Sequence, residues 1–191
     1  PRFIALNKKI IISAMRDINK ILKDYFGFES FRGEQESIIK RITEERKHSL
    51  VLMPTGSGKS LCYQIPALCF DNSTIVISPL IALMQDQVDV LRSKNIPAAF
   101  INSTLSKSDR EKRLNDFTAG KIKLLYVTPE RFRKKDFVDE IKKVKIDLLA
   151  VDEAHCISEW GHDFRPDYSR IGEFRGLMGN PLTIALTATA T

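Results

Sequence analysis

The segment Met53-Pro54-Thr55-Gly56-Ser57-Gly58-Lys59-Ser60 follows the apolar run Ser49-Leu50-Val51-Leu52 and decides the fold class. A glycine-rich loop between an apolar strand and a helix starting near Lys59 is typical of a phosphate-binding loop. Further along, Asp152-Glu153-Ala154-His155 follows a second apolar run, 146–151. Both segments are therefore expected at the C-terminal ends of buried parallel strands, which form the ligand-binding edge of an open α/β sheet.

The residue types at these two strand ends suit a nucleoside triphosphate. Lys59 is expected to reach the β- and γ-phosphates, and the hydroxyl of Ser60 suits Mg²⁺, which prefers hard oxygen ligands. Asp152 would supply a second oxygen to the metal, directly or through water, and Glu153 would be the general base that activates the attacking water. Backbone amides of the loop would hold the phosphates, from residues Thr55, Gly56, Ser57 and Gly58.

Position 53 departs from the general phosphate-loop pattern, because Met53 stands where that pattern has glycine. The form Pro-Thr-Gly-x-Gly-Lys-Ser is instead the one found in superfamily 2 helicases. Five further segments occur in the order of one family within that superfamily: 26–35, 78–87, 126–131, 156–168 and 185–190. From about Tyr25 to its last residue, the chain resembles the RecQ family of DNA helicases. The aromatic-rich segment that follows Asp152-Glu153-Ala154-His155 is the most specific part of this resemblance.

The resemblance implies an adenine site in the segment 26–35. Phe28 and Arg32 would enclose the base between them, and Gln35 would hydrogen-bond its edge. Phe28 stands where many family members have tyrosine, which keeps the stacking face and removes the hydroxyl. Phe26 and Phe31 are better explained as core aromatic residues beside a turn.

The resemblance also assigns the aromatic-rich segment to sensing DNA and linking its binding to ATP hydrolysis. Trp160, Phe164 and Tyr168 offer flat faces to unpaired bases, and Arg165 can bind phosphate or stack. The alternative is a buried aromatic cluster that packs a long loop onto the domain. His155 would couple the magnesium site to the strip from Thr187 to Thr189, or it is simply a hydrogen-bonded histidine.

Residues at other expected strand ends are candidates for contact with the DNA backbone, because of their place in the family pattern. These candidates are Pro79, Gln85, Ser103 and Arg131. Pro79 and Gln85 open an expected helix whose buried stripe would be Leu83, Val88 and Leu91. Capping and turn formation explain such residues equally well.

Composition sets limits on partners and compartment. The chain has 191 residues, 30 basic against 24 acidic, and a net charge of +6, which favours a polyanionic partner. Basic runs at 131–135 and 142–145 are equally well explained as solvated surface. Cys62, Cys69 and Cys156 show neither paired nor zinc-binding spacing, so we expect no zinc and an intracellular protein, in the cytoplasm or nucleoid or in the nucleus depending on the organism.

Apolar runs alternate with helical patterns, which predicts an α/β RecA-like domain with a mainly parallel sheet and helices on both faces. Strands are expected near residues 50, 75, 99, 124, 148 and 184, and helices near 37, 83, 112 and 138. Residues 1–191 would form one motor domain, with 1–35 comprising an N-terminal helical segment and the adenine motif. The resemblance implies that the second motor domain, with its arginine finger, is absent from this sequence.

The expected function is the ATP-binding half of a DNA helicase that unwinds in the 3′-to-5′ direction, nearly inactive alone, with single-stranded or partly duplex DNA and ATP as partners and roles in repair and recombination. Two alternatives stay open from the sequence. One is an RNA-directed superfamily 2 helicase, and the other is a nucleotide-binding regulatory module that hydrolyses nothing.

Overall fold

The computed structural model describes residues 17–157 and 165–189. Along the chain, an N-terminal helical pair is followed by alternating strands and helices. The elements are α2 (Ile18–Ile21), the π-helix η1 (Leu22–Phe26), α3 (Gln35–Thr43), β1 (Ser49–Leu52), α4 (Leu61–Cys69), β2 (Ser73–Ile77), α5 (Ile81–Ser93), β3 (Ala98–Ile101), α6 (Lys107–Thr118), β4 (Leu124–Val127), η2 (Pro129–Arg133), α7 (Lys135–Ile141), β5 (Ile146–Val151), η3 (Ala154–Ile157), η4 (Tyr168–Arg170), α8 (Ile171–Leu177) and β6 (Leu182–Thr187).

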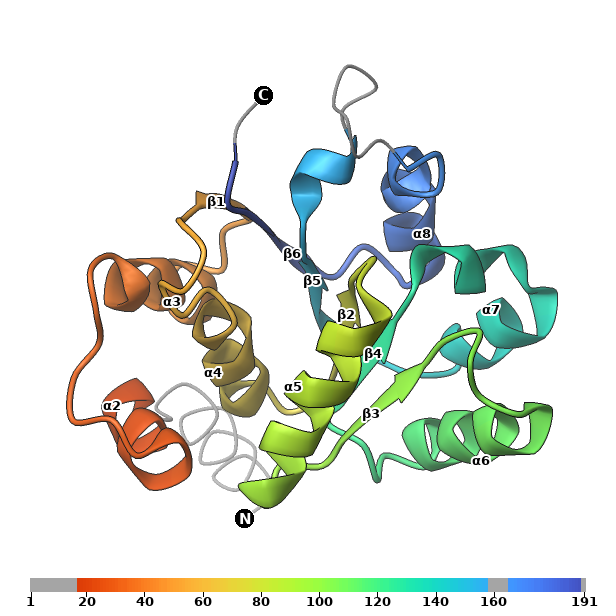
Figure 1. The fold of residues 1–191 in the computed structure, drawn as a ribbon, viewed down its shortest axis with the longest axis horizontal. Helices are drawn as coiled ribbons and strands as arrows, with labels where there is room; N and C mark the ends of the chain where they lie inside the picture. The colour runs from red at the N-terminus through yellow and green to blue at the C-terminus, as the bar shows by residue number, and fades with distance from the viewer. Residues whose placement is uncertain (1–16, 158–164, 190–191) are drawn as a thin grey trace, which may run out of the picture.

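The six strands form one sheet in the order β1-β6-β5-β2-β4-β3, and every described pair in it is parallel (Figure 1). Parallel neighbours require crossover connections, which the intervening helices supply. The carboxyl ends of all strands consequently meet at one edge of the sheet. The loops after β1 and β5, which carry the two motifs with phosphate and carboxylate chemistry, both leave from that edge.

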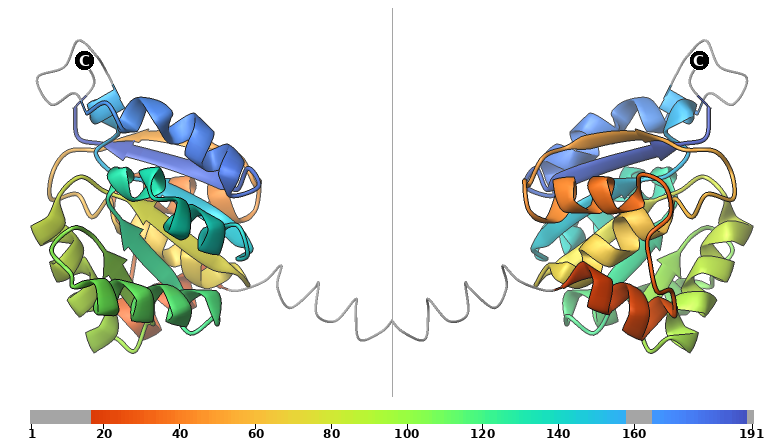
Figure 2. Two further views of the ribbon diagram at one scale, coloured as in Figure 1. Left: turned by 90° about the vertical axis from the view of Figure 1, so that its right-hand side faces the viewer. Right: turned by 90° about the vertical axis from the view of Figure 1, so that its left-hand side faces the viewer.

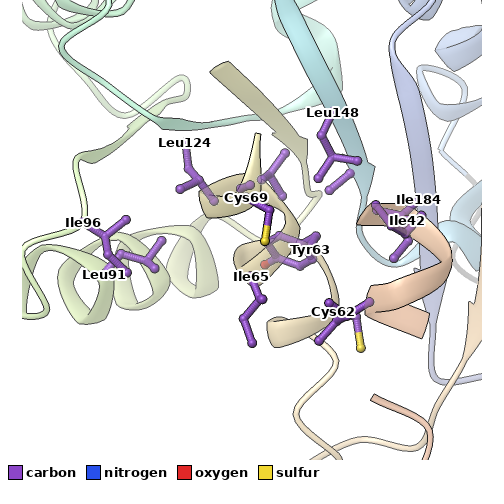
Figure 3. Packing of buried hydrophobic residues seen from close by; sticks show 14 of the residues in the cluster. Ile42, Cys62, Tyr63, Ile65, Cys69, Leu91, Ile96, Leu124, Leu148 and Ile184 are labelled. Atoms are coloured by element: carbon purple, nitrogen blue, oxygen red, sulfur yellow. The ribbon is translucent and has the colours of Figure 1, made fainter. Parts of the chain in front are cut away.

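Helices cover both faces of the sheet (Figure 2). On one face, α2, α3, α4 and α5 pack against strand residues such as Val76 and Leu148. On the other face, α6, α7 and α8 pack against residues such as Ile75 and Leu149. Figure 3 shows the first layer, in which Tyr63 of α4 lies near side chains of the strands. The predicted α/β class is confirmed.

All six predicted strands and all four predicted helices are present. Two details of the prediction are wrong. β1 is not a buried strand: it lies at the edge of the sheet, and Leu50 and Leu52 are 77% and 58% exposed. The buried stripe of α5 uses Met84 with Val88 and Leu91, not Leu83, because spacings of four and three residues keep a stripe on one helical face.

Within residues 17–157 and 165–189, none of the helices combines the length and the apolar character needed to cross a membrane.

Candidate active site

The phosphate-binding loop leaves the end of β1 in a tightly turned conformation. The amide of Met53 donates to the carbonyl of Thr187 at 3.0 Å, which continues the β1–β6 pairing for one residue. Gly56 and Gly58 have φ angles of 79° and 78°, in the left-handed region that favours glycine. α4 begins at Leu61, two residues after Lys59, where the sequence predicted its start.

The side chain of Gln35 holds the phosphate-binding loop through hydrogen bonds. Its side-chain amide donates to the carbonyls of Ser57 at 2.9 Å and Gly58 at 3.3 Å, and its carbonyl oxygen accepts from the amide of Arg32 at 2.9 Å. The residue is 2% exposed, so its polar atoms are used inside the protein. The sequence assigned Gln35 to the edge of adenine. In this structure it ties the adenine segment to the phosphate loop, and its carbonyl oxygen, which has two lone pairs and accepts one of these bonds, keeps the capacity for one more.

Phe28 and Arg32 lie side by side at the surface, as the adenine hypothesis requires. The guanidinium carbon of Arg32 is 5.7 Å from the centre of the Phe28 ring, and Phe28 is 43% exposed. Because a base stacked between two flat groups needs about 7 Å between them, the pair would open by roughly 1 Å to admit adenine. Phe26 is buried in the core and Phe31 packs against it, as predicted for both.

Asp152 is the most perturbed carboxyl group of the site. Burial raises its pKa to about 6, and the neighbouring charge of Glu153 adds to the rise. The backbone amide of Glu153, the charge of Lys59 and a hydrogen bond with Ser78 oppose it. The Asp152 carboxylate is therefore influenced both by the phosphate-loop lysine and by the loop that precedes α5.

The donors around Asp152 fit a magnesium ion. A buried carboxylate whose negative charge is only partly balanced favours a bound cation. Ser60, the second expected ligand, accepts the backbone amide of Tyr63 at 3.2 Å, and the charge of Asp152 acts on the hydroxyl of the same tyrosine. Ser60 and Asp152 would then hold the ion, as the sequence predicted.

Glu153 and His155 form a polar bridge to β6. Glu153 has a φ of 51°, an uncommon backbone conformation for a residue with a side chain. His155 Nδ1 lies 3.2 Å from Glu153 Oε2 and 3.0 Å from Thr187 Oγ1. The Thr187 hydroxyl donates to the carbonyl of Thr189 at 2.9 Å, so Nδ1 of His155 carries the proton and donates. The contact expected between His155 and the strip 187–189 is present.

The loop Ser78–Leu80 lies between the C-terminal end of β5 and the segment that starts at Arg165. The amide of Asp152 donates to the carbonyl of Ile77, the residue before this loop, at 2.8 Å, and Nη1 of Arg165 donates to the carbonyl of buried Pro79 at 3.4 Å. The amide of Arg165 also donates to the carbonyl of Cys156 at 3.1 Å. Arg165 thus joins the end of the aromatic-rich segment to Cys156 and to the Pro79 loop.

Tyr168 corrects a prediction. It is 1% exposed, so its ring is not open to an unpaired base, and its hydroxyl donates to the backbone carbonyl of Asp152 at 2.9 Å. Burial raises the pKa of Tyr168 far above its ordinary value, which keeps it a neutral donor. The buried-cluster alternative holds for this residue. Trp160 and Phe164 lie outside the described residues.

Unsatisfied polar atoms mark the next two strand ends. Asn102 Nδ2, Thr128 Oγ1 and Arg131 Nε are buried and have no hydrogen-bond partner in the described structure. Arg131 also lines a small cleft in which the basic residues outnumber the acidic ones; the others are Lys107, Arg110 and Lys134 against Glu111 and Asp136. Ser103 and Gln85 are exposed on the same edge. Partnerless donors beside several cations suit an anionic backbone.

The sequence did not identify Ser78, the three basic residues of the cleft, or the polar role of Tyr63. Ser78 could have been found, because it stands at a strand end next to Pro79. The cleft residues come from α6 and from the η2–α7 junction, which are separate in sequence, so no local pattern brings them together.

The comparisons with known proteins agree with one another on the family of this chain. Residues 32–191 match the DEAD/DEAH box helicase family. The chain is 53% identical over 172 residues to the ATP-dependent DNA helicase RecQ of Bacillus subtilis, covering 90% of this chain and 29% of that protein. It is 46% identical over 183 residues to ATP-dependent DNA helicase Q5 of Rattus norvegicus, covering 92% of this chain and 19% of that protein.

Solved structures agree on the fold. The Hef helicase domain of Pyrococcus furiosus superposes with a TM-score of 0.67 at 23% identity, covering 88% of this chain and 34% of that chain. The helicase MrfA, solved bound to DNA, superposes with a TM-score of 0.74 at 19% identity, covering 93% of this chain and 27% of that chain. The domain is therefore RecA-like, and the chain belongs to the DEAD/DEAH box helicase family, with homology to RecQ helicases over most of its length.

Proposed function

We propose that this chain is the ATP-binding first motor domain of a RecQ-type DNA helicase, which couples ATP hydrolysis to 3′-to-5′ unwinding of DNA. The observation that carries the proposal is the position of Asp152. The charge of Lys59 on the phosphate loop acts on its carboxylate, and its backbone amide donates to the carbonyl of Ile77, just before the loop that leads into α5, at 2.8 Å. One group therefore spans the nucleotide side and the strand-end surface proposed for DNA.

Each residue has a defined task in this proposal. Phe28 and Arg32 hold the adenine, while Lys59 and the loop amides hold the phosphates. Glu153 positions the attacking water and takes its proton, and His155 fixes Glu153 through the shared Nδ1 proton. When bound at Ser60 and Asp152, Mg²⁺ supplies positive charge that offsets the charge of the phosphate oxygens.

The relatives are much longer than this chain, which spans 29% of the Bacillus subtilis RecQ. We infer that residues 1–191 are one motor domain and that a second one completes the site with an arginine finger. Such a finger is worth about a thousandfold or more in rate, so the isolated domain would turn over very slowly. We also propose an intracellular location, because DNA and ATP, the proposed substrates, are found there.

The test is nucleic-acid-stimulated ATP hydrolysis by the full-length protein, followed by unwinding of duplexes with a 3′ or a 5′ single-stranded tail. We expect single-stranded DNA to raise turnover tenfold or more and only the 3′-tailed duplex to be opened. Glu153→Gln, which lacks the proposed general base, serves as the inactive control. Stimulation by RNA in preference to DNA would favour the RNA-directed alternative, and binding without turnover would favour the regulatory module.

A further inference from the structure

A chain of hydrogen bonds between polar side chains crosses the core beneath the phosphate loop. The side-chain amide of Gln64 on α4 donates to Gln87 Oε1 on α5 at 2.8 Å and to the Tyr126 hydroxyl on β4 at 3.3 Å. The Tyr126 hydroxyl donates to the hydroxyl of Tyr63 on α4 at 3.3 Å. Tyr63, Gln64 and Tyr126 are 2%, 4% and 1% exposed. We call Tyr63, Gln64, Tyr126 and Gln87 the polar relay.

One end of the polar relay reaches the nucleotide site. The backbone amides of Tyr63 and Gln64 donate to the carbonyl of Ser60, the expected magnesium ligand, at 3.2 and 3.0 Å, and the charge of Asp152 acts on the hydroxyls of Tyr63 and Tyr126. Burial raises the pKa of Tyr63 well above its ordinary value, so the residue remains a neutral hydrogen-bonding group. A change in the position of Ser60 therefore acts on Tyr63 and Gln64 through these two backbone hydrogen bonds.

The other end lies on α5, whose first residue is Ile81. That helix follows Pro79 and Leu80 directly, so a shift of α5 moves the loop that is proposed to contact DNA. Gln87 is the member of the polar relay that lies on α5. Its helix neighbours Met84, Val88 and Leu91 pack into the apolar layer. The hydrogen bond from Gln64 to Gln87 thus joins the phosphate-loop helix α4 to α5 through their side chains.

The composition of this region argues for a role beyond stability. Burying an amide and two hydroxyl groups stabilises a core less than burying leucine or phenylalanine of similar size, because each polar group must first lose its water. A fully paired network instead selects one arrangement of the elements that carry it, since a helix shift of about 1 Å breaks a bond outright. Such a network gives α4 and α5 a small number of discrete relative positions.

We propose that the polar relay is a set of positioning residues that transmits the nucleotide state of Ser60 and Asp152 to α5, and so sets the affinity of the Pro79 loop for DNA. This inference rests on the proposed function. Because linkage is reciprocal, DNA bound at that loop strengthens nucleotide binding by the same factor. The hydrogen bond from the Asp152 amide to the Ile77 carbonyl, beside the Pro79 loop, offers a second, shorter connection, so loss of the polar relay reduces the coupling and does not abolish it.

The test measures coupling in the full-length helicase, as the ratio of the affinities for single-stranded DNA with and without a non-hydrolysable Mg²⁺–ATP analogue. Tyr126→Phe keeps the ring and removes the central hydroxyl. Gln87→Leu breaks the contact at the half-buried end and leaves both buried tyrosines intact. Tyr25→Phe is the matched control, because Tyr25 is 42% exposed and lies outside the polar relay.

We expect a coupling ratio of fivefold or more in the unaltered protein and in Tyr25→Phe. In Tyr126→Phe and in Gln87→Leu the ratio should fall at least threefold, while the affinity for the nucleotide alone changes less than twofold. An unchanged ratio in both variants overturns the inference. So does a fall in nucleotide and DNA affinities together that leaves their coupling intact, which is what a purely structural role produces. Failure of the unaltered protein to bind nucleotide would instead refute the proposed function.

Discussion

Asp152 shows the conflict between stability and function at the scale of one residue. Its carboxyl group is buried next to Glu153, and its pKa rises from an ordinary value of 3.8 to about 6. A carboxyl group with a raised pKa binds its proton more tightly in the folded chain than in the unfolded chain. Its ionisation therefore destabilises the fold above pH 6, and this penalty is absent below pH 3.8, where both states are protonated.

Asp152→Asn should accordingly stabilise the protein without nucleotide or metal. We expect the free energy of unfolding to increase on the order of 2 kcal/mol at pH 8, with the difference shrinking towards zero near pH 4. Urea unfolding of both proteins across this pH range measures it. Added Mg²⁺ should stabilise the unaltered protein and have little effect on the variant. A variant less stable than the unaltered protein at pH 8 would show that Asp152 is not under electrostatic strain.

Substitutions at Lys59 and at Glu153 should have different effects on nucleotide binding and turnover. Lys59→Ala removes a cation that contacts phosphates in the ground state, so nucleotide affinity should fall about tenfold or more. Glu153→Gln preserves the shape of the side chain and removes the base, so affinity should stay within about threefold while turnover falls by about 10² or more. Calorimetry beside hydrolysis by the full-length protein separates the two. Equal losses of affinity would exclude Glu153 as the base.

At the scale of elements, local sequence patterns predicted the features that are determined by residues close together in the sequence. The phosphate loop, the strand before each motif and the helices all carry short-range signals in glycine positions and apolar spacing. Gln35 and Tyr168 could not be predicted in the same way. Their partners, the carbonyls of Ser57 and Asp152, lie in other elements and are brought near only by tertiary packing.

The buried position of Tyr168 gives a prediction for η4. Its hydroxyl supports the carbonyl of Asp152, so Tyr168→Phe leaves a part-buried acceptor without this donor. We expect the free energy of unfolding to fall by about 1 to 2 kcal/mol. Tyr25→Phe, which removes an exposed hydroxyl, should change it by less than about 0.5 kcal/mol. Equal stabilities of the two variants in a denaturant titration would mean that the Tyr168 hydrogen bond contributes nothing measurable.

At the scale of the whole molecule, the order of the strands was beyond the reach of the sequence. Apolar runs identified all six strands, and alternation with helices identified a parallel sheet, but neither signal says which strand is at an edge. The position of β1 follows from pairing with β6, which lies far from it in sequence, so no local pattern reveals the contact. The run 49–52 is apolar as in a buried strand, yet its outer face is open.

That open face makes a final prediction about self-association. Leu50 and Leu52 are adjacent on the same face of an edge strand, and edge strands with exposed apolar residues tend to pair with other chains. We expect this 191-residue chain to associate with itself at high concentration. Leu50→Thr keeps a residue that favours strands and removes most of the apolar area.

The substitution should weaken self-association about tenfold, the effect of losing between 1 and 2 kcal/mol of apolar contact. Sedimentation equilibrium over a range of concentrations measures the change. Val90→Thr is the matched control, because Val90 is 50% exposed on α5, away from β1, and its loss should leave association as it was. If both variants associate as the unaltered chain does, contacts between copies form through some other surface, and the exposed leucines of β1 do not drive them.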